Sequence, residues 1–289
     1  MASTSLDILA IAAHRDDVEQ TCGGTLLKAG QRGQRTGILD LTRGEMGTRG
    51  TADERAREAD DAAEILGVSW RRALDIPDGR VENTWENRLK VASVIRETRP
   101  RVVILPYWKG RHPDHYTASM LGYEACFLAG LAKLDPQAGL SIQPSAFSRE
   151  AAADASTAVR AGRPFGKLRA GSQESRQDAG ARNGATTLAP HRPFKIVYAT
   201  LYYDIRPTFV VDISEQFEGK LSSIMAYKSQ FSDQEPGQDL FPGHDEIRAR
   251  VEAMARYYGM LGGVTYAEPF LQKEVGLVDD LLAIPVKSI

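Results

Sequence analysis

The sequence is poor in the features that mark secreted and membrane proteins. It has two cysteines in 289 residues, Cys22 and Cys126, which are too few and too far apart for a disulfide framework or a thiolate zinc site. Its first apolar stretch, residues 6–13, is too short to span a bilayer and has no basic flank before it, which argues against a signal peptide. We therefore expect a cytoplasmic protein with reduced thiols and no membrane partner.

The sequence also lacks an excess of charge of either sign. Lys and Arg number 36 against 38 Asp and Glu, so the formal net charge is -2, and nucleic acid is not an expected partner. Neither a Gly-x-Gly-x-x-Gly nor a Walker phosphate loop is present. A hydrophobic content of 42% and a length of 289 residues are typical of one large globular domain.

Short apolar runs alternate with amphipathic stretches through the first half of the chain, and this alternation predicts repeated strand and helix units. We expect strands at residues 6–13, 36–42, 72–76, 101–106, 194–203 and 208–212, and helices at residues 18–29, 51–66, 85–98, 214–231 and 244–261. Thr51 and Glu54 have the spacing of a capping box. Because parallel strands need helical crossovers, the pattern favours a three-layer, Rossmann-like α/β fold with a mostly parallel sheet.

One segment, residues 143–189, differs from the rest in composition. Its 47 residues include 12 alanines but only five large apolar side chains, too few to offset the entropy of ordering the backbone. Its seven Lys and Arg are spread out among four Asp and Glu, which disfavours a basic binding arm. We interpret it as a flexible insertion within a single domain of residues 1–289.

The residues that can do chemistry follow two of the expected strands. His14 ends the first strand and precedes Asp16 and Asp17, and His112 and His115 follow the fourth strand. Because the carboxyl ends of parallel strands meet at one edge of a sheet, the two groups should lie together. Two imidazoles and a carboxylate suit a divalent transition metal with open positions. One aspartate would then ligate while its neighbour accepts a proton from water, as in a hydrolase.

Other interpretations of these residues are open at this point. Each motif alone is also typical of a loop-capping cluster, since Asp114 can cap a helix that begins near Pro113. Two histidines and one carboxylate are likewise the ligand set of non-haem Fe(II) oxygenases. A sugar-binding protein without catalysis is a third alternative.

The motifs resemble those of a known family. Residues 13–17, Ala-His-Arg-Asp-Asp, resemble the Ala-His-Pro-Asp-Asp signature of the PIG-L (LmbE-like) zinc-dependent deacetylases, and residues 112–115, His-Pro-Asp-His, are similar to the second motif of that family. Further segments resemble the branch that makes bacillithiol, the N-acetyl-α-glucosaminyl L-malate deacetylases. They are residues 40–51, 77–79, 227–231 and 266–270. The resemblance covers nearly the whole chain outside residues 143–189.

The resemblance implies a role for each residue of the two motifs. His14, Asp17 and His115 would hold Zn²⁺, with Fe²⁺ or another divalent metal also compatible. Asp16 would be the general base, His112 would stabilise the oxyanion, and Asp114 would orient His112. Arg15 stands where the family has proline, and its guanidinium would be able to compete for Asp16 or Asp17.

The substrate implied by the resemblance is a small N-acetylglucosaminyl conjugate, most simply N-acetylglucosaminyl L-malate, from which acetate is removed. The alternatives are a bacillithiol-conjugate amidase or a deacetylase of another N-acetylglucosamine compound. Homotrimers or homohexamers are also implied.

Several side chains are candidates for holding this substrate. Arg43 and Arg49, in the glycine-rich loop after the second strand, would either grip the malate carboxylates or brace the loop. Arg192 and Lys228 are further candidates from the resemblance alone. Tyr107 and Trp108 would either stack on a sugar or pack in the core.

Overall fold

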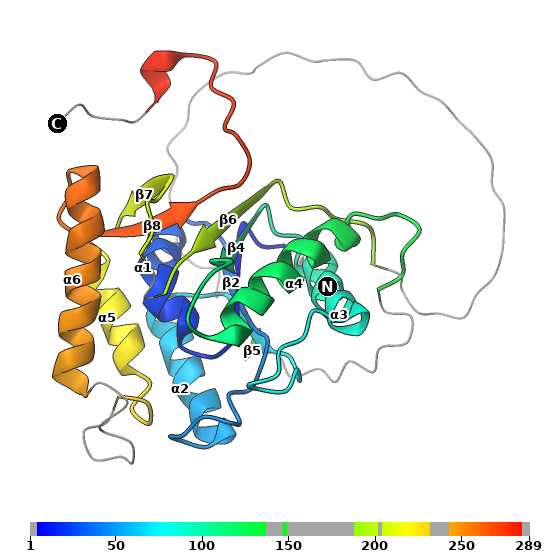
Figure 1. Ribbon diagram of the computed structural model, residues 1–289, viewed down its shortest axis with the longest axis horizontal. Helices are drawn as coiled ribbons and strands as arrows, with labels where there is room; N and C mark the ends of the chain where they lie inside the picture. Colours follow the sequence, from blue (N-terminus) through cyan, green and yellow to red (C-terminus); the bar gives the residue numbers. More distant parts are fainter. Residues whose placement is uncertain (1–4, 137–146, 149–187, 202–203, 232–242, 285–289) are drawn as a thin grey trace, which may run out of the picture.

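The computed structural model describes the chain except for residues 1–4, 137–146, 149–187, 202–203, 232–242 and 285–289 (Figure 1). Its strands are β1 (Ile8–Ala12), β2 (Thr36–Asp40), β3 (Trp70–Ala73), β4 (Val102–Pro106), β5 (Phe147–Ser148), β6 (Lys195–Ala199), β7 (Phe209–Asp212) and β8 (Ala267–Leu271). Its helices are α1 (Asp17–Gln31), α2 (Ala52–Ile65), α3 (Trp85–Thr98), α4 (Pro113–Ala129), α5 (Phe217–Met225) and α6 (His244–Gly262), with a 3₁₀ turn at Leu281–Ala283.

The strands form one sheet in the order β5-β3-β2-β1-β4-β6-β8-β7. Five adjacent strands run parallel to one another: β3, β2, β1, β4 and β6. At one edge β5 pairs antiparallel with β3. At the other edge β8 pairs antiparallel with β6, and β7 pairs antiparallel with β8. The helices α3 and α4 pack on one face and α1 and α2 on the other. The predicted three-layer, mostly parallel α/β fold is therefore confirmed.

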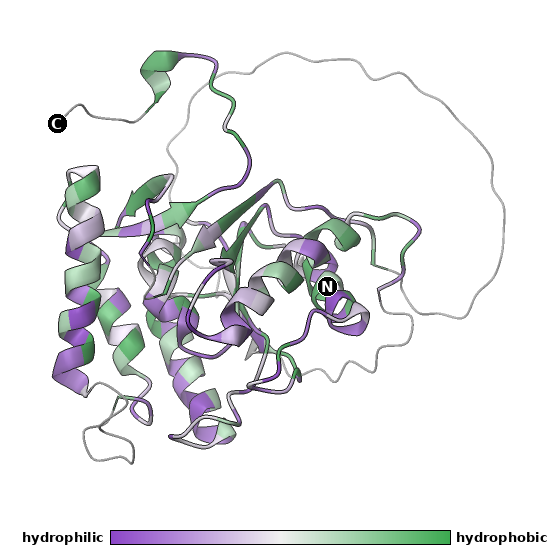
Figure 2. Cartoon of the chain, viewed as in Figure 1, coloured by the Kyte–Doolittle hydropathy of each residue, from purple (hydrophilic) through white to green (hydrophobic). Residues whose placement is uncertain are grey.

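The alternation of side chains along β1 explains the three layers. Leu9 and Ile11 pack into the cluster that includes α3 and α4, while Ala10 and Ala12 pack into the cluster that includes α1 and α2. All four side chains are at most 3% exposed. A strand buried on both faces must be apolar throughout, and Figure 2 shows the strands in the middle of the sheet coloured mainly as hydrophobic.

Local sequence signals place several helix ends. Thr51 and Glu54 form both bonds of the predicted capping box at the start of α2, and α3 spans the predicted residues 85–98. The helix α1 is kinked at Cys22, whose φ is -141°. Just beyond the kink, the N–H groups of Gly24 and Thr25 donate to the Glu268 carboxylate at 2.9 and 2.7 Å, so Glu268 caps the second part of the helix.

The structure differs from the sequence prediction at the C-terminal edge. The strand β8 was not predicted, because it contains Pro269, which is unusual inside a sheet. It lies between β6 and β7, so these two predicted strands are not direct neighbours. Of the predicted insertion at residues 143–189, all but residues 147–148 and 188–189 lies outside the described residues. Among the helices that the structure describes, none is long and apolar enough to cross a membrane.

Candidate metal centre

Two strand-to-helix turns bring the predicted residues together. His14 follows β1, and Asp17 is the first residue of α1. His112 is the N-cap residue of α4, and His115 lies in the first turn of that helix. Because β1 and β4 are parallel neighbours, both turns lie at the carboxyl edge of the sheet, as predicted.

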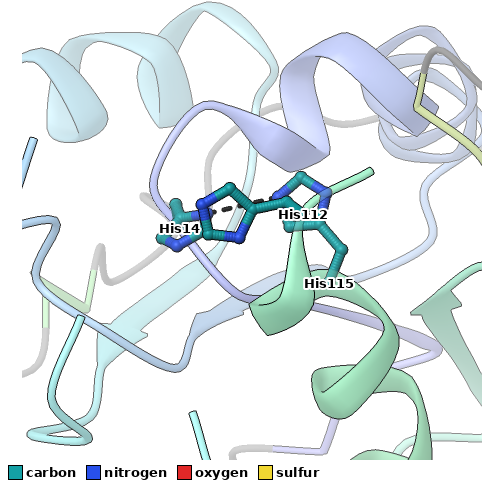
Figure 3. A group of neighbouring side chains, drawn as sticks. All are labelled: His14, His112 and His115. Carbon is teal, nitrogen blue, oxygen red and sulfur yellow. Dashed lines mark hydrogen bonds between the residues drawn. The ribbon is translucent and has the colours of Figure 1, made fainter. Parts of the chain in front are cut away.

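Three side chains converge on one point at this edge. His14 Nδ1 lies 3.2 Å from His115 Nε2 (Figure 3), and Asp17 oxygens lie 3.2 Å from His115 Nε2 and 3.5 Å from His14 Nδ1. Ligand atoms at about 2.0–2.2 Å from a tetrahedral zinc are separated by about 3.3–3.6 Å. Asp17 approaches the two rings with different oxygens, Oδ1 at His115 and Oδ2 at His14. The spacing of the three side chains, called the metal triangle below, is compatible with a shared metal ion.

The other nitrogen of His14 faces two buried carboxylates. His14 Nε2 lies 3.0 Å from Asp78 Oδ1 and 3.2 Å from Asp114 Oδ2. The Asp114 carboxylate also accepts the N–H groups of Gly79 and Val81 at 2.8 and 3.1 Å. A carboxylate on the far nitrogen of a histidine selects its tautomer and orients its ring toward a metal.

This arrangement corrects the expectation that Asp114 orients His112. The carboxylate of Asp114 contacts His14, and only the backbone N–H of Asp114 reaches His112, donating to its Nδ1 at 3.2 Å. The reason is local, since Asp114 lies in the first turn of α4 and its side chain is directed toward the loop that contains Gly79.

His112 is exposed and lies beside the other two histidines. Its ring centroid is 4.8 Å from that of His14 and 5.0 Å from that of His115. Burial and the nearby His14 lower the pKa of His112. Ring nitrogens of all three histidines lie within 4.8 Å of one another, so this trio is a second possible set of metal ligands. His14 with Asp78 and Asp114 is a third possible set.

The site carries more negative than positive charge. Burial alone would lower the pKa of His14, but hydrogen bonds with Asp114, Asp17 and Asp78 outweigh it and raise this pKa to about 12. Burial opposes ionisation of Asp17, yet His115 and His14 hold its pKa well below the usual range. The cluster thus stabilises a positive charge at its centre, which either a proton or a metal ion can supply.

Asp16 lies next to the triangle in an unusual backbone conformation. Its φ is 89°, in the left-handed region that residues other than glycine rarely adopt. Its carboxylate accepts hydrogen bonds from Gln20 at 3.1 Å and Arg55 at 3.3 Å. Burial raises the pKa of Asp16 to about 7, with Arg55 opposing and Asp17 reinforcing the shift, and this value suits a general base at neutral pH.

Arg15 does not compete for the two aspartates that flank it in the sequence. Its guanidinium donates to the backbone oxygen of Ala52 at 2.7 Å, at the start of α2. Arg15 is 9% exposed, so it joins the loop after β1 to α2 rather than reaching into the site.

The four predicted substrate-binding residues separate in the structure. Arg43 is exposed in the loop after β2. Arg49 is 3% exposed and donates to the Gln230 backbone oxygen at 2.9 Å, so it braces the loop instead of facing a ligand.

Arg192 and Lys228 lie elsewhere in the fold. Arg192 precedes β6 and covers the Phe127 ring at 5.0 Å. Because β6 runs parallel to β4, this position is at the amino edge of the sheet, away from the histidines. Lys228 is exposed beside the acidic outer surface of α2.

The two aromatic candidates follow β4. Trp108 packs against the core cluster of α3 and α4, with the Lys273 ammonium 4.8 Å from its ring centroid. The ring of Tyr107 lies 4.5 Å from that of Trp108. The face of Trp108 is therefore used in packing and in a cation–π contact.

The sequence prediction missed two residues of the site, Asp78 and Arg55. Asp78 is part of the segment at residues 77–79 that carries the resemblance, but no role was assigned to it. Arg55 follows the capping box by one position, where it is indistinguishable from the other arginines of α2. Neither contact has a local sequence signal, because both bridge distant parts of the chain.

Comparison with known proteins identifies the family. Residues 9–126 match the PIG-L family, described as GlcNAc-PI de-N-acetylase. The uncharacterized deacetylase YaiS of Escherichia coli is 32% identical over 158 residues, which are 48% of this chain and 80% of YaiS. This chain belongs to the PIG-L family. It is thus a member of the LmbE-like deacetylases, and the matched residues include both histidine motifs.

Two other proteins resemble the chain over most of its length. Diacetylchitobiose deacetylase of Thermococcus kodakarensis is 29% identical over 272 residues, which are 90% of this chain and 80% of that protein. The crystal structure of the conserved protein TT1542 from Thermus thermophilus is 35% identical and superposes with a TM-score of 0.69, covering 95% of this chain and 98% of that one.

Proposed function

We propose that this PIG-L protein is a metal-dependent hydrolase that removes acetate from an N-acetylglucosaminyl compound. The observation that supports this most directly is the triangle of His14, Asp17 and His115, whose atoms lie 3.2–3.5 Å apart, beside Asp16. A metal triangle with an adjacent carboxylate outside it is the arrangement used to activate water.

The donor set fits a divalent metal such as zinc. Two imidazole nitrogens and one carboxylate oxygen are its usual ligands in catalytic sites, and the pKa of His14 raised to about 12 reports a surplus of carboxylate charge that a cation would balance. When bound, such a metal supplies Lewis acidity and lowers the pKa of a coordinated water to about 7.

Asp16 and His112 carry out the proton transfers and the stabilisation of the oxyanion. Asp16 takes a proton from the attacking water, whose oxygen bonds to the acetamide carbon. His112 accepts the Asp114 N–H on Nδ1, so its neutral ring carries a proton on Nε2 and can donate a hydrogen bond to the developing oxyanion. The carbon–nitrogen bond then breaks, the amine takes the proton held by Asp16, and acetate leaves. Water and amide are thus converted to acetate and a free amine.

The group attached to N-acetylglucosamine has two candidates. L-malate is supported by the motifs that resemble the bacillithiol branch and by exposed Arg43, which is available to pair with a carboxylate. A second N-acetylglucosamine is supported by the activity in the name of the Thermococcus relative. A bacillithiol-conjugate amidase would use the same metal centre to remove a larger acyl group from the same glucosamine nitrogen.

The deciding experiment combines metal analysis with acetate release. Protein stripped by a chelator and reloaded with Zn²⁺ or Fe²⁺ is assayed on N-acetylglucosaminyl malate, diacetylchitobiose, free N-acetylglucosamine and a bacillithiol S-conjugate. We expect metal-dependent acetate release, greatest with the malate glycoside. Greater turnover of diacetylchitobiose would assign the second aglycone, and cleavage of the S-conjugate alone would assign the amidase. Absence of acetate release from all four metal-loaded reactions would refute the deacetylase proposal.

A further inference from the structure

A small cavity lies directly beside the metal triangle. Its volume is about 30 Å³, and Asp17 and His115 form part of its wall. The rest of the wall comes from the kinked part of α1, from β1 and β4, from the loop after β4 that contains Tyr107 and Lys109, and from the end of β6. The cavity is therefore within reach of a group whose carbonyl lies at the metal triangle.

Small apolar side chains form one part of the wall of this cavity, and the larger Ile11, Ile104 and Leu105 form another. Ala12, Val18, Cys22 and Ala199 are each at most 3% exposed and belong to the apolar cluster between the sheet and α1. The hydroxyl of Thr21, which also lines the cavity, already donates to the Asp17 backbone oxygen at 2.8 Å. The cavity thus offers an apolar surface to a bound group.

The size of the cavity limits what can enter it. A cavity of about 10–15 Å³ admits one water molecule, so about 30 Å³ is room for a methyl group and little more. Of the four small residues named above, three are alanine or cysteine, and a larger side chain at any of these positions would fill the space.

We infer that this cavity receives the methyl of the substrate's acetyl group and restricts the enzyme to short acyl chains, an inference that rests on the proposed deacetylase function. The acetamide carbonyl lies at the metal triangle, and its methyl enters between Val18 and Ala199. A propionyl or butyryl group places additional methylenes against Val18 and Cys22. Val18 and Ala199 are therefore specificity-determining residues for the acyl group.

The inference is tested with N-acetyl-, N-propionyl- and N-butyrylglucosaminyl substrates that share one aglycone. One methylene in an apolar pocket discriminates by about 10–200-fold, so the wild-type kcat/KM should fall by about that factor from acetyl to propionyl. Val18→Ala removes two methyl groups from the wall and should reduce the acetyl-to-propionyl ratio at least about tenfold. Ala199→Val should lower kcat/KM for the acetyl substrate.

Val68→Ala is the matched control. Val68 is 4% exposed against 2% for Val18 and lies in the same apolar cluster, but it does not line the cavity. Metal content and the thermal unfolding midpoint are measured for every variant, so that loss of the fold or of the metal is seen separately. The control should keep the wild-type ratio of acyl substrates.

The outcomes separate the two proposals. If acetate is released but Val18→Ala and Val68→Ala show the same acyl preference as wild type, the cavity does not hold the acyl group and is a packing void or a water site. If metal-loaded wild-type protein releases no acyl group from any substrate, the deacetylase function fails, and the acyl pocket with it.

Discussion

The general-base assignment makes a sharp prediction for Asp16→Asn. The amide has nearly the same shape, but it has one acceptor oxygen where Asp16 uses two, Oδ2 for the Gln20 donor and Oδ1 for the Arg55 donor, so it keeps one of these bonds, and it cannot take a proton from water. A positioned base contributes about 10²–10⁴ in rate, so we expect kcat to fall by that factor, or about 3–5 kcal/mol in activation free energy. Metal content should not change.

The stability of this variant provides an independent check. The pKa of Asp16 is raised to about 7 in the folded protein, above its value of about 4 in an unfolded chain. The cost of ionising Asp16 in the folded protein therefore lowers the free energy of unfolding as the pH rises from about 4 toward 7. Asparagine stays neutral, so the variant does not have this cost. In metal-free protein at pH 8 we expect Asp16→Asn to unfold at the same temperature as wild type or higher.

The assay measures acetate release, zinc per chain and thermal unfolding for wild type, Asp16→Asn and the control Asp61→Asn, which changes an exposed aspartate on α2. In wild type, kcat/KM should rise with pH on the acid side as the base loses its proton, and this rise should be absent from the residual activity of Asp16→Asn. Turnover near the wild-type level in a variant that retains its zinc would refute the assignment.

Three further predictions concern the remaining residues of the centre. Asp17→Ala should lose zinc, since it removes one vertex of the triangle, and the zinc content after dialysis measures this; full occupancy would exclude Asp17 as a ligand. His112→Ala should keep zinc and lower kcat by about 10²–10³, the effect of removing one oxyanion donor, whereas loss of zinc without a separate loss of kcat would make His112 a ligand. Because the pKa of His14 is raised to about 12 without metal, His14 holds a proton at neutral pH that metal must displace, so zinc affinity should increase with pH. Calorimetry in two buffers of different ionisation enthalpy measures the released proton, and equal binding enthalpies in both buffers would contradict its release.

The sequence was sufficient for the parts of the site that depend on strand order. His14 and His115 could be brought together because each follows a buried strand, and the strands that carry them were recognisable from apolar runs. Parallel packing of β1 against β4 then leaves little freedom in where the following turns lie. The capping box at Thr51 was likewise predictable, because its two residues lie three positions apart in the sequence and bond to each other at the start of α2.

The sequence was insufficient where a residue acts through a distant contact. The Asp78 carboxylate reaches His14 from a loop 64 positions along the chain, and no periodicity encodes that approach. Arg192 was a substrate-binding candidate from the resemblance alone. Its position at the amino edge of the sheet follows from the parallel pairing of β6 with β4, which the single sequence does not specify. Glu268 belongs to a strand containing proline, so its role as a helix cap was hidden with the strand.

The turn that carries Asp16 and Asp17 is held from several directions, and this explains how a strained residue persists there. Arg55 bonds both the Arg15 backbone oxygen, at 2.9 Å, and the Asp16 carboxylate. The His14 N–H donates to Asp17 Oδ2 at 3.0 Å. The kink at Cys22 separates this first turn from the rest of α1. The Lys220 ammonium donates to the Gln20 backbone oxygen before the kink and to the Glu268 carboxylate, which caps the part of α1 after the kink. Under the proposed roles, two adjacent residues serve one site with Asp16 in the left-handed region, and the surrounding bonds supply the stabilisation that such a backbone lacks.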